Sequence, residues 1–301
     1  NADFSAPQVT VAINDLSGSL RGQPISGEGT LRYADQQFIS DGLQLQSGDA
    51  SLNLRADEQA LQMALEIPSA GQLHAAAAGS LKADMSMQAL PGERLRLDRG
   101  QLQLQLSGID LGWQQQAVQT LSVNADLTLA DAGLLGDVEL VLDDLTGGSD
   151  QWLHKASLQW HSDTQGQQLQ LSAQRDDSSL QLQLAGTTPG QRSFAPWRDD
   201  FAWQGNLQDM QLQDRQLGTW QQPTGADISY VSGLLQLQPV CLQGSDDNTG
   251  SSLCISSKLA SAGPGKPLSV TAGLDIEQLP VALLTRLTDA AISSDQRMSG
   301  S

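Results

Sequence analysis

The chain has few aromatic residues and little positive charge. Aromatics make up 4% of its 301 residues, and 16 Lys and Arg face 34 Asp and Glu, a formal net charge of −18. A surface of this sign repels nucleic-acid phosphates and anionic lipid headgroups. No apolar stretch approaches the roughly 18 residues of a membrane-spanning helix. Any contact with lipid would therefore be made through acyl chains.

Catalytic motifs are missing as well. The sequence has no G-x-S-x-G elbow, no P-loop and no Cys–His nucleophile pattern. Paired acids occur at Asp143–Asp144, Asp176–Asp177 and Asp199–Asp200. Neighbours in a strand face opposite ways, so no pair works as one acid–base couple, although carboxylates on separate strands could still hydrolyse glycosides. With few aromatics to stack on sugars, we predict that the chain is not an enzyme and needs no cofactor.

Metal ligands are equally sparse. His154, His161 and Asp163 lie near one another in the sequence, but their spacing matches no zinc pattern. The DDNTG segment at 246–250 lacks the residue order and distal Glu of a calcium loop. We predict solvent-facing strand ends and a hydrated hairpin tip at these two places, and no metal site.

The two cysteines flank a turn-like stretch. Cys241 and Cys254 lie on either side of QGSDDNTGSS. This arrangement favours a disulfide across a β-hairpin, which would place the chain in an oxidising compartment. Two buried free thiols are the alternative.

What the sequence does contain is strict alternation of apolar and polar residues. Because side chains alternate between the faces of a strand, this pattern predicts strands with one apolar and one polar face. The clearest runs are 101–108 (QLQLQLSG), 121–130, 137–144, 168–174 and 179–186, and the weaker ones are 8–16, 61–67 and 268–276. Segments rich in Gly, Pro, Asp and Ser separate them, as expected of turns.

Helical patterning is scarce. One short amphipathic helix is predicted near residues 279–288, where LPVALLTRL places Pro280 in the first turn. No break in composition divides the chain, so we expect residues 1–301 to be a single continuous segment.

The apolar face of these strands is almost uniformly Leu and Val. A sheet of so many strands must curl, which predicts an all-β fold in which a long, curled antiparallel or mixed sheet forms an open apolar groove. An ordinary sandwich or barrel is the alternative. The residues expected to line the groove are Leu52, Leu54, Leu102, Leu104, Leu106, Leu121, Val123, Leu127, Leu129, Val138, Leu140, Leu142, Leu169, Leu171, Leu180, Leu182 and Leu184.

The six tryptophans have two interpretations. They could seal the rim of the groove or fill the ends of hairpins, and we favour the hairpin ends. They are Trp113, Trp152, Trp160, Trp197, Trp203 and Trp220.

Three ordered blocks carry a family resemblance. Residues 16–56 are similar to a repeating unit of Gly-punctuated strands, and residues 201–243 contain two tryptophans and a Pro-x-Cys-Leu motif. The second cysteine follows in SLC (252–254), and then DIEQLPVALL (275–284). In these blocks the chain resembles the TamB family, part of the AsmA-like group of bridge-like lipid transfer proteins. Residues 57–200 resemble the family only through their alternation.

The resemblance implies both an architecture and a function. It implies a folded sheet called a β-taco that shields phospholipid acyl chains during transport between inner and outer membranes. It also implies the periplasm of a Gram-negative bacterium, an inner-membrane anchor in the full-length protein, and an outer-membrane barrel partner such as TamA. Because the chain starts at Asn1 without a signal-like segment, we expect an interior piece lacking that anchor and the C-terminal domain.

Two other functions stay open. The chain could be a periplasmic assembly factor for outer-membrane β-barrel proteins and autotransporters, acting with the same barrel partner. It could also be a structural rod or adhesin fragment with a closed core.

Overall fold

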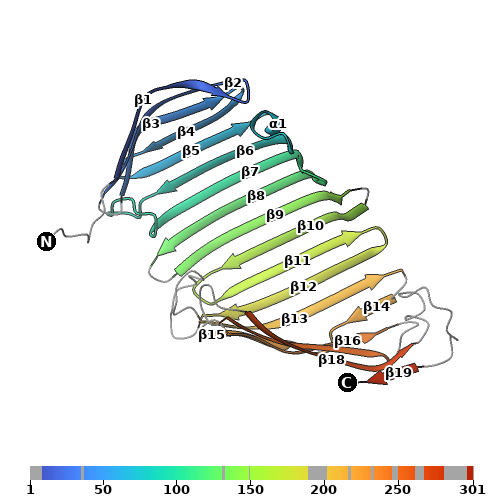
Figure 1. Ribbon diagram of the computed structural model, residues 1–301. Coiled ribbons are helices and arrows are strands. Elements are labelled where there is room, and N and C mark those ends of the chain that lie inside the picture. Colours follow the sequence, from blue (N-terminus) through green and yellow to red (C-terminus); the bar gives the residue numbers. More distant parts are fainter. Residues whose placement is uncertain are drawn as a thin grey trace. The chain divides into compact units, whose positions relative to one another are not determined.

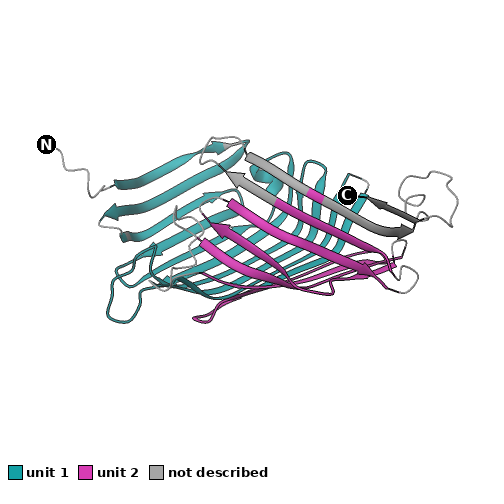
Figure 2. Ribbon diagram, turned by 90° about the horizontal axis from the view of Figure 1, so that it is seen from below, with its two compact units in different colours: residues 1–159 teal, residues 160–301 magenta. Residues whose placement is uncertain are grey.

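A computed structural model gives the fold of the chain. The structure describes residues 9–34, 37–130, 133–148, 150–188, 202–215, 218–231, 234–245, 250–261, 268–280 and 297–300. The chain divides into two compact units, residues 1–159 and 160–301, which Figure 2 shows in different colours. Each unit is described by itself.

The first unit is an antiparallel meander in which each strand from β1 to β9 pairs with the next (Figure 1). Its strands are β1 (Val9–Leu20), β2 (Gln23–Ala34), β3 (Gln37–Ser47), β4 (Ala50–Ala56), β5 (Ala60–Ile67), β6 (Ala77–Gln88), β7 (Gly100–Trp113), β8 (Gln116–Ala130) and β9 (Gly133–Gly147). The single-turn helix α1 (Ala70–Leu73) joins β5 to β6. The boundary between the units falls within β10 (Asp150–Ser162).

The second unit is also antiparallel in every pairing. Its strands are β11 (Gln167–Arg175), β12 (Ser178–Thr187), β13 (Ala202–Asp214), β14 (Gly218–Gln221), β15 (Ala226–Val231), β16 (Leu234–Gly244), β17 (Ser252–Ser261), β18 (Leu268–Pro280) and β19 (Arg297–Gly300). The short strands β14 and β15 both lie between β13 and β16, pairing with different parts of each. Together they act as one strand interrupted at residues 222–225.

The predicted all-β class is confirmed, and of the two predicted arrangements, antiparallel or mixed, the described pairings are antiparallel. Every run of alternation falls within a strand: 101–108 in β7, 121–130 in β8, 137–144 in β9, 168–174 in β11 and 179–186 in β12. The weaker runs fall in β1, β5 and β18. The helix expected near 279–288 lies outside the described residues, except that Leu279 and Pro280 are the last two residues of β18.

The two units bury few of their hydrophobic side chains. Among the described residues, thirteen hydrophobic side chains are buried, and nine of them form three small clusters. A two-layer domain would instead have one continuous core between its layers. Within each unit, the described elements with substantial contacts are hydrogen-bonded neighbours, together with α1 on β6. None of the described helices has the length and apolarity to cross a membrane.

Candidate functional site

The strand registers of the first unit join apolar side chains into rows that run across the strands. Residues directly opposite one another on neighbouring strands share a face, so a row can be followed from pair to pair. The central row, from β3 to β9, is Leu43, Leu54, Met63, Met85, Leu104, Ala125 and Val138. Six strand spacings of about 4.8 Å make this row about 29 Å long, close to the thickness of a bilayer's hydrocarbon core.

Three further rows flank the central one on the same face. One is Leu45, Leu52, Leu65, Ala83, Leu106, Val123 and Leu140, and beyond it lie Ile67, Leu81, Gly108, Leu121 and Leu142. On the other side run Ala56, Leu61, Met87, Leu102, Leu127 and Gly136, and Leu129 lies between Gly100 and Leu134. The structure therefore places the twelve predicted residues of this unit on one face.

The second unit has a comparable face. Leu169 is opposite Leu184, Leu171 is opposite Leu182, and Leu180 is opposite Ala173. The rows continue into β13 and β15 through Leu207, Met210, Leu212, Ala226 and Ile228. The five predicted residues of this unit thus also share one face.

These side chains are partly covered and not sealed. Of the seventeen predicted residues, sixteen are half-buried, and Leu127 is 9% exposed. On the opposite face of β7, Gln101, Gln103 and Gln105 are exposed. The partial burial of the leucines comes largely from neighbours in the same sheet, which leaves their outer surface available to an apolar ligand.

Several residues of these rows escaped the sequence analysis. Met63, Leu65 and Met85 could have been found by extending the alternation in β5 and β6. Met210 could not, because a register shift opposite Gln183 and Leu184 breaks the alternation of β13 between Leu207 and Met210. A bulge of this kind has no clear signature in a Gln- and Leu-rich strand.

Residues 89–99, which connect β6 to β7 and which we call the strap, cover one side of the first unit's apolar face. Leu95 of the strap is 2% exposed and packs with Ala56, Leu61 and Met87. Two backbone hydrogen bonds fasten the strap, from Leu95 N to Glu58 O at 2.7 Å and from Ala89 N to Gln59 O at 2.8 Å. The row containing Leu102 and Leu127 is therefore partly closed, while the other rows lie beyond the strap.

Tryptophans border the apolar face of the second unit. Trp203 shares the face of Leu207, and a Cβ on either Gly186 or Gly205 would lie 2.1 Å from its indole ring. The ring thus lies across two glycines, and its Nε1 donates to Gln167 Oε1 at 3.1 Å. Trp220, which is 4% exposed, packs with Leu242, Met210, Leu212 and Leu253.

The other tryptophans have varied surroundings. Trp113, at the turn between β7 and β8, stacks on His74 with ring centroids 4.6 Å apart. Trp152, which is 43% exposed, lies over Gly147, and Trp160 is half-buried in β10. Trp197 lies outside the described residues. Trp113 thus has the predicted place at a hairpin end, whereas Trp203 and Trp220 border the apolar face.

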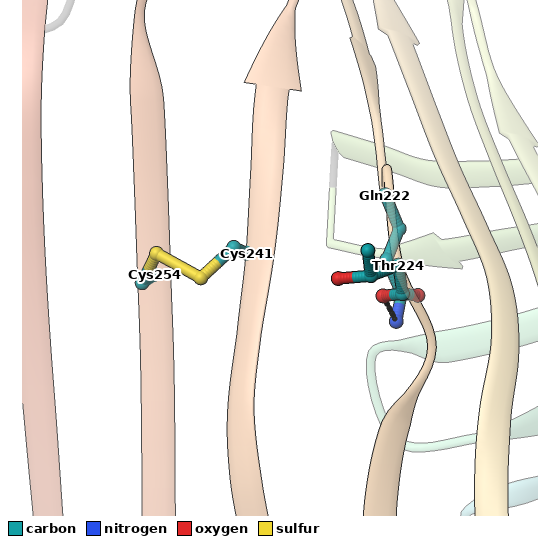
Figure 3. Close-up of a disulfide and its surroundings, with 4 residues drawn as sticks. All are labelled: Gln222, Thr224, Cys241 and Cys254. Carbon is teal, nitrogen blue, oxygen red and sulfur yellow. Dashed lines mark hydrogen bonds between the residues drawn. A yellow bond between two sulfur atoms is a disulfide. The ribbon is translucent and has the colours of Figure 1, made fainter.

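Cys241 and Cys254 form a disulfide between β16 and β17 (Figure 3), with their sulfur atoms 2.11 Å apart. The neighbours of Cys241 in β16, Val240 and Leu242, are both buried in the apolar clusters. Because successive side chains point to opposite faces, the disulfide lies on the face away from those clusters. It therefore joins the two strands without entering the apolar surface.

Replacing both cysteines by serine should lower stability and spare the apolar face. Closing a loop of this length is worth about 2–3 kcal/mol, which we expect the Cys241→Ser, Cys254→Ser variant to lose in chemical unfolding. Retention of any apolar ligand at low denaturant should stay unchanged. A loss of ligand as large as the loss of stability would place the disulfide in the binding surface.

Beside the disulfide, residues 222–225 interrupt the strand formed by β14 and β15. Gln222 is buried, and its Nε2 donates to Leu207 O at 3.1 Å. The same Nε2 donates to Thr224 O at 2.7 Å (Figure 3). Its side chain thus joins a carbonyl oxygen of β13 to one within the interruption. The amide keeps the interruption ordered next to the apolar cluster of Leu207 and Ala226.

The polar face of the first unit is hollowed over β3–β7. Its polar lining consists of Gln44, Asn53, Arg55, Gln62, Asp84, Ser86, Gln103 and Gln105, and Leu43, Leu54, Met63 and Met85 of the central row also border it. Amides, a hydroxyl and charged groups stay well hydrated, so an acyl chain gains little by entering such a hollow. The apolar rows, and not this hollow, form the candidate binding surface.

His154 and His161 each lie close to an aspartate that is near in the sequence. His154 Nδ1 lies 3.2 Å from Asp144 Oδ1, and His161 Nε2 lies 3.7 Å from Asp163 Oδ2. Backbone N–H groups of Gln165 and Gly166 donate to Asp163 Oδ1 and lower the pKa of this carboxyl. Asp163 therefore closes the turn between β10 and β11. Among the described residues, no group of three His, Cys, Asp or Glu side chains has the geometry to hold a metal ion.

An all-β chain whose antiparallel strands carry continuous, half-buried apolar rows is consistent with a β-groove. The chain belongs to the TamB family, because the family model "TamB, N-terminal domain" matches residues 5–301. No curated protein and no solved structure matches it. TamB is a transport and assembly family with a role in envelope assembly and lipid transport. Its members are envelope-spanning and work with an outer-membrane partner.

Proposed function

We propose that the chain is a bridge segment whose apolar rows shield phospholipid acyl chains as lipids move between the inner and outer membranes. The observation that carries the proposal is the uninterrupted row from Leu43 to Val138, whose members the strand registers align across seven strands. The lipid-facing residues are the seventeen predicted ones together with those that complete their rows. No catalytic step and no cofactor is part of the proposal.

The transfer free energy of an acyl chain favours a continuous apolar surface. Each methylene removed from water is worth about 0.8 kcal/mol, so a sixteen-carbon tail in water costs on the order of 10 kcal/mol. Leu, Met, Val and Ala offer nearly equal contact at each strand, so a chain moving along a row meets no deep trap. Transport direction would have to come from elsewhere in the system.

The setting of the proposal follows from the family. We place the chain in the periplasm of a Gram-negative bacterium, as one continuous segment of a protein anchored in the inner membrane. A TamA-like barrel in the outer membrane is the proposed partner. The disulfide between Cys241 and Cys254 supports an oxidising compartment.

The test is native mass spectrometry of protein purified without detergent, which should reveal bound phospholipid. Leu104→Arg should lower the retained lipid about tenfold, because excluding about two methylenes from the row costs about 1.6 kcal/mol. Gln103→Arg, on the exposed opposite face of the same strand, is the matched control and should retain lipid as the wild type does. Protein that never carries phospholipid would contradict the proposal and favour a closed rod.

One observation favours the assembly-factor alternative. In β1, the apolar side chains Val9, Val11 and Leu16 are 53%, 49% and 41% exposed, which suits an extended peptide laid against this strand. An assembly factor should bind peptides copied from outer-membrane barrel strands. Peptide binding that survives Leu104→Arg and Leu182→Arg would support this role over the lipid conduit.

A further inference from the structure

The two ends of the strands in the first unit differ in how their apolar side chains are covered. The strap lies at the ends where β6 finishes and β7 begins, and α1 lies at the opposite ends of β5 and β6 (Figure 1). We call this second side the α1 edge, residues 67–81 and 108–121. The apolar rows extend from the row beside the strap, which contains Leu102, to the row at the α1 edge, which contains Leu121.

At the strap, the apolar face is partly closed by Leu95. Leu95, at 2% exposure, is surrounded by Ala56, Leu61 and Met87, and Leu102 and Leu129 pack against the same cluster. A methyl terminus that reached the cluster around Leu95 would meet hydrocarbon, and a headgroup inserted into that cluster would lose its water. Burial of polar groups without partners is strongly unfavourable, so the strap side suits tails and not headgroups.

At the α1 edge, the face stays open. Ile67, Leu81, Leu121 and Leu142 are half-buried, and none belongs to a buried cluster of the described residues. Farther out, Trp113 is 50% exposed. A polar group at this edge keeps its water while the chain attached to it lies on the rows.

We infer that the strap orients lipid in the first unit, with acyl tails directed toward Leu95 and headgroups held at the α1 edge. The inference rests on the proposed function and adds the direction in which the lipid enters. Because backbone hydrogen bonds fasten the strap to Glu58 and Gln59, in the turn between β4 and β5, its position is part of the fold.

The arginines of the strap are the main objection to this orientation, because phosphates bind arginine. Arg94 lies 3.6 Å from Glu58, Arg96 lies 2.8 Å from Asp98, and Arg99 lies 2.7 Å from Glu93. Each guanidinium is therefore already neutralised by a carboxylate. Exposed ion pairs are weak, however, so a phosphate could compete for them. The experiment must therefore show whether the headgroup lies at the strap or at the α1 edge.

The test uses two photoactivatable phosphatidylethanolamines in vesicles of unlabelled phosphatidylethanolamine and phosphatidylglycerol. One lipid carries a diazirine at the end of an acyl chain, and the other carries it on the headgroup amine. After incubation with the full chain and illumination, labelled peptides are mapped by mass spectrometry. The tail probe should label residues 89–99 at least about tenfold more than the headgroup probe does, and the ratio should reverse at the α1 edge.

A pair of variants on the strap supplies the control. Leu95→Gln places an amide in the closed cluster and should allow the headgroup probe to label the strap. Leu97→Gln, two residues away at a side chain that is 48% exposed, should leave the labelling pattern unchanged. If Leu95→Gln fails to fold, the two probes on the wild-type chain still decide the orientation.

Two results would contradict different claims. Strong labelling of the strap by the headgroup probe in the wild type would overturn the orientation, and it would indicate that the arginines bind phosphate. Absence of labelling by both probes, together with absence of phospholipid in the purified chain, would contradict the proposed function itself.

Discussion

Gly29→Ala should destabilise the chain far more than Gly42→Ala, although the two glycines have almost the same backbone conformation. Their φ angles are +126° and +129°, which side chains rarely adopt, so each substitution carries about 1–3 kcal/mol of backbone strain. A Cβ on Gly29 would also lie 2.1 Å from Gly42 O and 2.6 Å from Leu43 Cα, whereas a Cβ on Gly42 meets open space. The clash is with backbone of the paired strand, which cannot move aside alone.

The difference in the free energy of unfolding between the two variants measures the cost of the close approach of β2 and β3 at Gly29. We expect Gly29→Ala to lose at least about 2 kcal/mol more than Gly42→Ala in the free energy of unfolding. Urea unfolding followed by circular dichroism measures both. Equal losses would show that backbone strain alone decides the need for glycine, and that the two strands can separate slightly without cost.

Leu95→Ala should have the second large effect on stability. Leu95 has the least exposed large hydrophobic side chain of the described residues, and truncating such a leucine costs about 3–4 kcal/mol through lost burial and a residual cavity. Leu97→Ala removes a side chain that is 48% exposed and should cost less than about 0.5 kcal/mol. Leu95 and Leu97 both lie in the strap, so comparing the two variants separates the effect of the buried Leu95 side chain from the effect of altering the strap in general.

Hydrogen exchange locates the effect of Leu95→Ala. The amides of Leu95 and Ala89 donate to Glu58 O and Gln59 O, so they should lose protection before the amides within β6 and β7. Uniform loss of protection across β4–β9 would mean that the strap is an inseparable part of the core. Unchanged protection at Leu95 would contradict the role of its side chain in holding the strap.

The alternation of apolar and polar residues was enough to predict eight strands, which are β1, β5, β7, β8, β9, β11, β12 and β18. A period of two leaves little freedom, because a strand with that pattern must show one apolar face, and Gly-, Asp- and Ser-rich segments end each run. The pairing of the cysteines could also be predicted from their position around a turn. In both cases the deciding interactions are local in sequence.

The composition of the apolar rows depended on long-range pairing. Whether Leu104 lies beside Met85 or one residue farther along is decided by the register of β6 against β7, and a slip of one residue would reverse the face of every side chain in a strand. The bulges at Gln183 and Leu184 and between Leu237 and Val240 are such register decisions. They follow from the fit of neighbouring strands and not from either strand alone.

The sequence by itself thus determined an all-β chain with one apolar face, since alternation is a property of each strand separately. Only the tertiary structure decided which leucines form one row, that Leu95 covers the end of that face, and that the disulfide lies on the other side. Those outcomes join residues far apart along the chain, and their free energy depends on which neighbours meet and how much water they exclude.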